Sequence, residues 1–169
     1  MLLDREKSIA VWDRVYQTFH FCHSTNTSVV PFSIALPHVV YDICGTSKSR
    51  PDQFDQLITA AFIRCTLPGE RLYAMDWQHS SFLFDPRIPE QMCLQYVEDT
   101  RCFSGGYHAF FPDYFPDGDY YFFIDEQFRF AYLSYPWRQE VWIAGEILIH
   151  EFAKIAPQLG WRKKEDFSQ

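Results

Sequence analysis

The chain has 169 residues, of which 47% are hydrophobic and 22% charged, enough for one substantial core and too little for two. Fifteen basic and 22 acidic residues leave a net charge of −7, which would repel the phosphates of a nucleic acid. No apolar run reaches the roughly 18 residues that a bilayer crossing needs, so we expect neither a nucleic acid nor a membrane as partner.

Three elements are predicted in the first third of the chain. Apolar residues in 4–19 recur three or four positions apart, which predicts a helix with one apolar stripe. The Ser-, Thr- and Asn-rich segment 22–31 is typical of a loop, and the β-branched run 38–43 is typical of a strand. A second amphipathic helix is expected from Ser49-Arg50-Pro51 to Cys65, before a Pro68-Gly69 stop.

The middle of the chain predicts two strands and one ambiguous segment. Residues 71–77 and 81–84 have strand composition and are joined by a polar turn, 78–80. The segment 88–106 has no clear period. It fits a short helix near 90–97 or a long loop.

The C-terminal part predicts a run of strands and a final helix. Asp117-Gly118 is a hairpin signal, and strands are expected at 120–124, 128–134 and 140–143. The first of these is apolar without a break, which indicates a central strand covered on both faces. A last helix is predicted at 145–159 and a frayed tail at 161–169.

Together these elements predict one α+β domain over 1–169. Its sheet is mostly antiparallel, has about five to seven strands and is flanked by helices. The five cysteines are an odd number without a Cys-x-x-Cys pair, and the N-terminal segment becomes charged before a signal-length apolar region develops. We therefore expect a cytoplasmic protein.

The residue patterns predict no metal and no cofactor. His20, Cys22 and His23 are possible zinc ligands, but no second cluster with zinc spacing accompanies them. His150-Glu151 lacks the second histidine of a zinc protease motif. Asp113, Asp117 and Asp119 do not follow the spacing of an EF-hand loop. Phosphate-binding glycine loops and the Gly-x-Ser-x-Gly elbow are absent, and we assign no catalytic residue.

Loop-borne aromatic, acidic and arginine residues are the candidates for binding, because such clusters are typical recognition anchors. The alternative is that these aromatic residues seal the edge of the core while their polar atoms bond locally. The candidate residues are Asp76, Trp77, His79, Asp117, Asp119, Trp137 and Arg138.

These stretches resemble a bacterial family known as domain of unknown function 2716. The resemblance covers most of the chain. It is carried by Val11-Trp12-Asp13 with Phe19, Leu72-Tyr73-Ala74-Met75-Asp76-Trp77-Gln78-His79, Pro116-Asp117-Gly118-Asp119-Tyr120-Tyr121 and Pro136-Trp137. A histidine commonly precedes the Pro-Trp pair in this family, whereas the position is Tyr135 here. The resemblance implies the fold and a shared face, and no established activity.

Two functions follow as hypotheses, and a purely structural subunit is a third. The leading one is a protein-binding module, an immunity-like inhibitor whose acidic, aromatic face binds a basic partner. The alternative is a small-molecule-binding protein or enzyme. In it, Asp76, His79 and Asp119 converge in a pocket walled by Trp77 and Trp137. The oligomeric state is left open.

Overall fold

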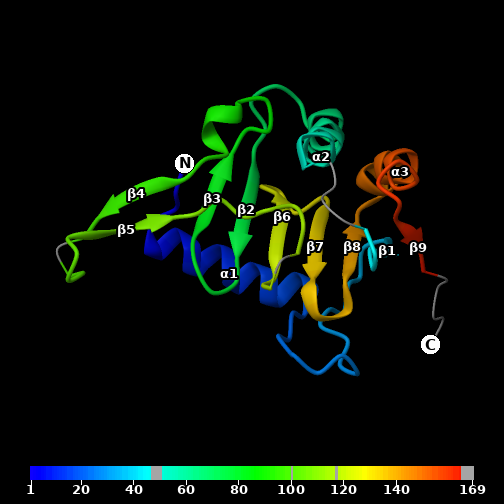
Figure 1. The fold of residues 1–169 in the computed structure, drawn as a ribbon, viewed down its shortest axis with the longest axis horizontal. Helices are drawn as coiled ribbons and strands as arrows, with labels where there is room; N and C mark the ends of the chain where they lie inside the picture. The colour runs from blue at the N-terminus through cyan, green and yellow to red at the C-terminus, as the bar shows by residue number, and fades with distance from the viewer. Residues whose placement is uncertain (47–50, 100, 117, 165–169) are drawn as a thin grey trace.

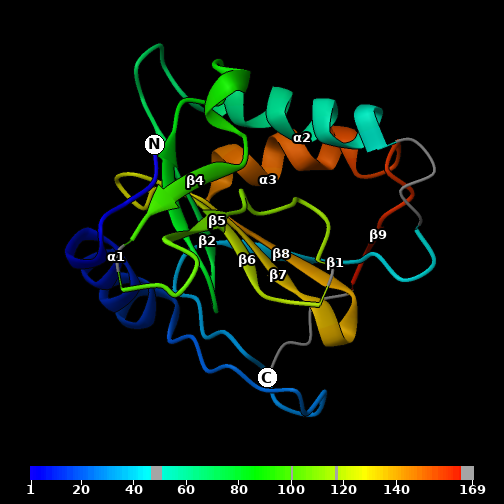
Figure 2. The ribbon, with the colours of Figure 1, turned by 60° about the vertical axis from the view of Figure 1, so that its left-hand side comes forward.

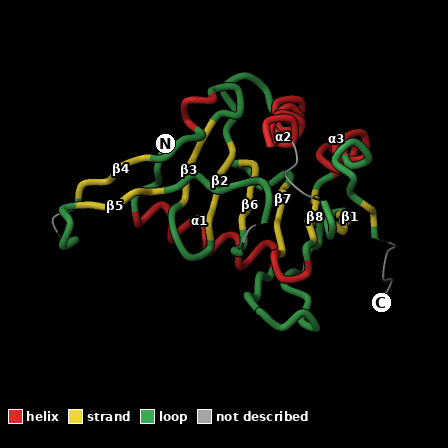
Figure 3. Tube along the Cα trace, in the orientation of Figure 1, coloured by secondary structure: helices red, strands yellow, loops and turns green. Residues whose placement is uncertain are grey.

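The computed structural model describes residues 1–46, 51–99, 101–116 and 118–164. Its main sheet has seven strands, all paired antiparallel. They are β1 (His38–Asp42), β2 (Leu72–Asp76), β3 (Ser81–Phe84), β6 (Tyr121–Asp125), β7 (Ala131–Tyr135), β8 (Glu140–Ala144) and β9 (Arg162–Lys163). Their order is β3-β2-β6-β7-β8-β1-β9 (Figures 1 and 3). The predicted α+β class with a mostly antiparallel sheet is confirmed.

Helices cover both faces of this sheet. They are α1 (Arg5–Phe19), α2 (Pro51–Cys65) and α3 (Glu146–Ile155), with short 3-10 turns η1 (Pro89–Gln91) and η2 (Pro136–Arg138). Figures 1 and 2 show α1 on one face and α2 with α3 on the other. Ser49 and Arg50, expected to open the second helix, lie outside the described residues. Among the residues that the structure describes, no helix combines the length and apolarity of a membrane span.

The sheet therefore separates two aromatic cores. Phe62 of α2 and Phe123 of β6 pack in the core under α2 and α3. Phe19 of α1 and Phe122 of β6 pack in the core on the α1 side. Successive residues of a strand point to opposite faces, and Phe122 and Phe123 are both fully buried. The prediction that 120–124 forms an interior strand covered on both faces is confirmed.

The segment 88–106 contains a strand, whereas the sequence predicts a short helix near 90–97 or a long loop. Gln95–Glu98 forms β4 and pairs with β5 (Gly106–Ala109) in a separate two-stranded sheet, which projects from the body in Figure 1. Along β4 the side chains alternate between half-buried and exposed, and Val97 packs against the core. Burial that alternates at every second residue is typical of a strand. A strand of four residues is too short for this alternation to be recognised in the sequence.

The strand pairing expected across Asp117-Gly118 is not present among the described residues. Asp117 itself lies outside the described residues. The chain before it, 110–116, contains no strand, and β6 pairs with β2 and β7. Tyr114 is instead buried, with its ring centroid 4.6 Å from that of Phe123. Burial of aromatic rings thus draws this segment over the core and away from strand pairing.

The C-terminal segment is more ordered over 161–164 than a frayed tail. Trp161 is buried, and its ring stacks on Phe152 of α3. Arg162–Lys163 then pairs with β1 as β9. The predicted final helix ends earlier than expected, at Ile155, and Gly160 has the left-handed φ of 72°. Residues 165–169 lie outside the described part of the chain.

An ion pair joins the two helices on one face. The buried Glu151 of α3 accepts from Lys154 Nζ at 2.6 Å and from Arg64 Nε of α2 at 2.5 Å. These bonds, Lys154 first and Arg64 second, lower the pKa of Glu151 from an ordinary 4.5 to about 2. Because both cations are half exposed, water screens the pair, and we assign it about 1 kcal/mol.

We expect Glu151→Gln to lower the free energy of unfolding by about 1 kcal/mol at pH 7. Since the folded pKa is depressed, the contribution is complete above pH 4.5 and is lost as the pH falls toward about 2. Urea denaturation at several pH values should therefore show the two proteins converging in acid. Glu98→Gln, at an exposed position of β4, is the matched control and should show no such convergence.

Candidate functional site

The candidate site lies at the end of the sheet where β2 and β7 end and β6 and β8 begin (Figure 1). The register pairs Asp76, the last residue of β2, with Tyr121, the first residue of β6. Asp119 lies two residues before Tyr121 and so comes to the same end. His79 stands in the turn between β2 and β3. We call Asp76, His79 and Asp119 the carboxylate–histidine cluster.

Short contacts define this cluster. His79 Nδ1 lies 2.9 Å from Asp76 Oδ1 and 3.8 Å from Asp119 Oδ2. Each of the three residues offers one atom that could bind a metal ion, and these three atoms lie within 4.8 Å of one another. Backbone amides hold both carboxylates, since Gln78 N donates to Asp76 Oδ1 and Tyr120 N donates to Asp119 Oδ1. Backbone amides of the turn and of the start of β6 therefore help to orient the two carboxylates.

Burial makes this cluster electrostatically unusual. Asp76 and Asp119 are each 7% exposed, whereas His79 is largely exposed. Burial first, and then the neighbouring Asp76 carboxylate, raise the pKa of Asp119 to about 6. The hydrogen bond with Asp76 raises the pKa of His79. The cluster thus brings two desolvated carboxyl groups together under a single imidazole.

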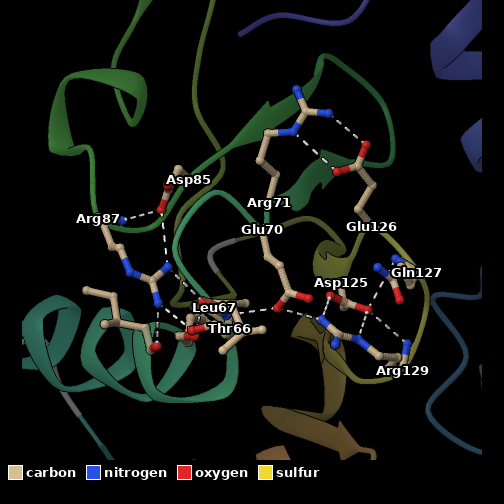
Figure 4. Close-up of polar contacts among 12 residues, drawn as sticks. Thr66, Leu67, Glu70, Arg71, Asp85, Arg87, Asp125, Glu126, Gln127 and Arg129 are labelled. Atoms are coloured by element: carbon tan, nitrogen blue, oxygen red, sulfur yellow. Dashed lines mark hydrogen bonds and ion pairs between the residues drawn. The ribbon is translucent and has the colours of Figure 1, made fainter.

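Other buried carboxylates of the sheet and helices have strong cationic partners. At the opposite end of the sheet, Arg129 pairs with Asp125 at 2.8 Å and with Glu70 at 2.9 Å (Figure 4). Glu140 of β8 pairs with Arg138 and Lys164. Among the described residues, neither carboxylate of the cluster forms an ion pair with an arginine or lysine. The cluster is therefore the place where buried negative charge is least compensated.

Aromatic residues adjoin the cluster in the chain, since Trp77 follows Asp76 and Tyr120 follows Asp119. The Trp77 indole stacks on His23 with centroids 4.3 Å apart, and its Nε1 donates to the Tyr16 hydroxyl at 3.3 Å. The buried Tyr120 ring contacts both indoles, with centroids 6.2 Å from Trp77 and 5.1 Å from Trp137. Trp137 remains 37% exposed. Tyr120 thus contacts one exposed indole, that of Trp137, and one half-buried indole, that of Trp77.

The structure brings together most of the residues that the sequence singles out. Asp76, Trp77, His79 and Asp119 are neighbours, and Trp137 joins them through Tyr120. Asp117 lies outside the described residues.

Arg138 has a different environment. Its Nε lies 2.9 Å from Glu140 Oε1, and Glu140 is almost fully buried. The charge of Arg138 is therefore matched within the chain, which favours a structural role for this side chain.

Three neighbours of the cluster escape the sequence-based prediction. Tyr120 looks like an ordinary strand residue, and Tyr16 like part of a helical stripe. His23 stands out only as a possible zinc ligand, whereas its ring covers Trp77. At the position before the Pro-Trp pair, the Tyr135 hydroxyl donates to the carbonyls of Asn26 and Val29. Tyr135 thus fastens the loop beside the site.

Comparisons with known proteins agree with the predicted resemblance. The chain is 25% identical over 173 residues to "Uncharacterized protein YxiI" of Bacillus subtilis (strain 168), which covers 93% of this chain and 94% of that protein. No solved structure matches the chain. The model of the family described as protein of unknown function (DUF2716) matches residues 2–149, and the chain therefore belongs to this family.

Proposed function

We propose that the chain is a protein-binding module whose carboxylate–histidine cluster receives a lysine or arginine side chain of a basic partner. The observation that carries this proposal is the pair of buried carboxylates, Asp76 and Asp119, which among the described residues have the imidazole of His79 near them and no arginine or lysine partner. A buried charge is costly unless it is paired, and the other buried carboxylates described above are paired within the chain. A cationic group from outside would complete the cluster in the same way.

The surroundings of the cluster support a protein partner. An exposed indole such as Trp137 is a typical anchor of a protein interface, and it contacts Tyr120, the residue that follows Asp119. The net charge of −7 would attract a basic partner from a distance and repel nucleic acid. An immunity-like inhibitor of a toxin in the cytoplasm would act this way, since a carboxylate pair blocks a catalytic lysine or arginine.

Capture of the partner from a lysate of the host tests this proposal. We expect the immobilised chain to retain a stoichiometric basic protein at low salt and to release it as the ionic strength rises. Asp119→Asn should abolish this capture, because the substitution removes a desolvated charge and keeps an oxygen that can accept from Tyr120 N. Asp13→Asn, at an exposed position of α1, is the matched control and should capture normally. Equal capture by both variants would refute the proposal.

A small-molecule-binding protein or enzyme is the second candidate. It is favoured by the 2.9 Å contact between Asp76 Oδ1 and the exposed His79, because a carboxylate that orients an imidazole is typical of general acid–base sites. The same purification distinguishes the two functions. A chain that emerges without a protein partner and carries a metabolite, identified by mass spectrometry, would favour this candidate over the first.

A further inference from the structure

We infer that the carboxylate–histidine cluster binds a divalent first-row metal ion in the free protein, through Asp76, His79 Nδ1 and Asp119 Oδ2. Sequence spacing predicts no metal here, because the three ligands come from a turn and from a segment 40 residues further along the chain. The register between β2 and β6 brings them together. The inference does not depend on the identity of any protein partner.

The distances suit a shared ion. With metal–ligand bonds of about 2.1 Å, adjacent ligand atoms of a tetrahedral or octahedral site lie about 3.0–3.5 Å apart. His79 Nδ1 lies 2.9 Å from Asp76 Oδ1 and 3.8 Å from Asp119 Oδ2. Because His79 is exposed, its ring has room to turn by the small amount that would even out these separations. The remaining coordination positions would face solvent on the His79 side.

In the part of the chain that the structure describes, the ligand oxygen Asp119 Oδ2 has no cationic side chain of its own. Only 9% of the Asp119 side chain is exposed, and its Oδ1 accepts from Tyr120 N. Oδ2 lies 3.8 Å from His79 Nδ1, beyond hydrogen-bond distance, and its other near polar group is the carboxyl of Asp76. Among the described residues no arginine or lysine reaches it. Two carboxylates this close repel each other while both are ionised, and one cation bound between them and the imidazole would relieve that repulsion.

The supporting contacts are those of a prepared ligand set. Backbone amides of Gln78 and Tyr120 hold one oxygen of each carboxylate, which fixes their direction. Outer contacts of this kind orient metal ligands and contribute to affinity. Two carboxylates and one imidazole without a thiolate favour a first-row ion such as Mn²⁺, with water in the open positions. A partner's lysine or arginine would compete with this ion, since both need the same two carboxylates.

Titration of the chelator-treated full-length protein with Mn²⁺ alone tests the inference, with free Mn²⁺ followed by electron paramagnetic resonance. We expect one ion per chain, and at least about tenfold weaker binding by His79→Ala and by Asp119→Asn. His79 is exposed, so His79→Ala leaves the core untouched and decides the question even if Asp119→Asn does not fold. Mn²⁺ is chosen because thiolates such as those of the exposed Cys22, Cys44 and Cys93 bind it poorly.

Two controls complete the design. Asp13→Asn removes an exposed acidic side chain from α1 and should bind Mn²⁺ like the native chain. His23→Ala should also retain binding, because the ring of His23 stacks on Trp77 and is not one of the three ligands. Failure of the native chain to bind, equal binding by all variants, or loss in His23→Ala alone would overturn the inference. Partner capture without Mn²⁺ binding would leave the proposed function intact.

Discussion

Replacing Phe123 with alanine is expected to lower the free energy of unfolding by about 3–5 kcal/mol. Phe123 is fully buried in an interior strand of the sheet. Its ring lies at centroid distances of 4.6–6.3 Å from rings of α2, β3, β7 and the segment before β6. These rings are Phe62, Phe84, Phe111, Tyr114 and Tyr132. Because the neighbours come from separate elements, they cannot all collapse into the cavity that alanine leaves.

Guanidinium denaturation followed by circular dichroism measures this loss. Phe103→Ala makes the same chemical change at a fully exposed position between β4 and β5, and it should alter stability by less than about 0.5 kcal/mol. Natural domains of this size have a total stability of about 5–15 kcal/mol, so Phe123→Ala would leave the chain close to unfolding. A loss below about 1 kcal/mol would show that this ring cluster is not the core on the α2 side.

Prediction from the sequence succeeds where one element carries its own period. The helix at 4–19 and the strand at 120–124 follow from residues within each segment, and the structure has α1 and β6 there. The segment 88–106 fails because β4 is only four residues long and its partner, β5, begins at Gly106. The Asp117-Gly118 signal misleads because turn residues specify only the local backbone conformation. Pairing of the flanking strands depends on rings such as Tyr114 that pack elsewhere.

The candidate site is predictable to a similar extent. Asp76 and His79 share a turn, so their proximity follows from local sequence, and the sequence supports only a hypothesis that Asp119 joins them in a pocket. Asp119 reaches Asp76 because β2 pairs with β6 in this register. Neither the order of the strands nor their register can be derived from the periodicity of the sequence. The sequence does not predict that Arg138 is paired within the chain. Glu140, two residues further on, is buried, and it also pairs with Lys164 of the C-terminal segment. Long-range electrostatics of this kind depend on the folded structure.

Gly145→Ala is expected to lower the free energy of unfolding by about 4 kcal/mol, the sum of a backbone term and a packing term. Gly145 precedes α3 with φ 90° and ψ 128°, a conformation that residues with a Cβ rarely adopt. A Cβ there would lie 2.5 Å from the carbonyl oxygen of Arg129 and 2.7 Å from Phe130 Cβ. The backbone of Arg129 and Phe130 cannot move as easily as the end of a flexible side chain, so β8 and α3 would have to shift.

Gly69→Ala separates these two terms. Gly69 has nearly the same φ, 88°, but no atom lies within 4 Å of its added Cβ. Its substitution should therefore carry the backbone term alone, about 1–2 kcal/mol. Thermal and guanidinium denaturation of both variants give the difference, which we assign to the close approach of Gly145 to Arg129 and Phe130. Equal losses would contradict this account and leave only the positive φ as the reason for glycine at the start of α3.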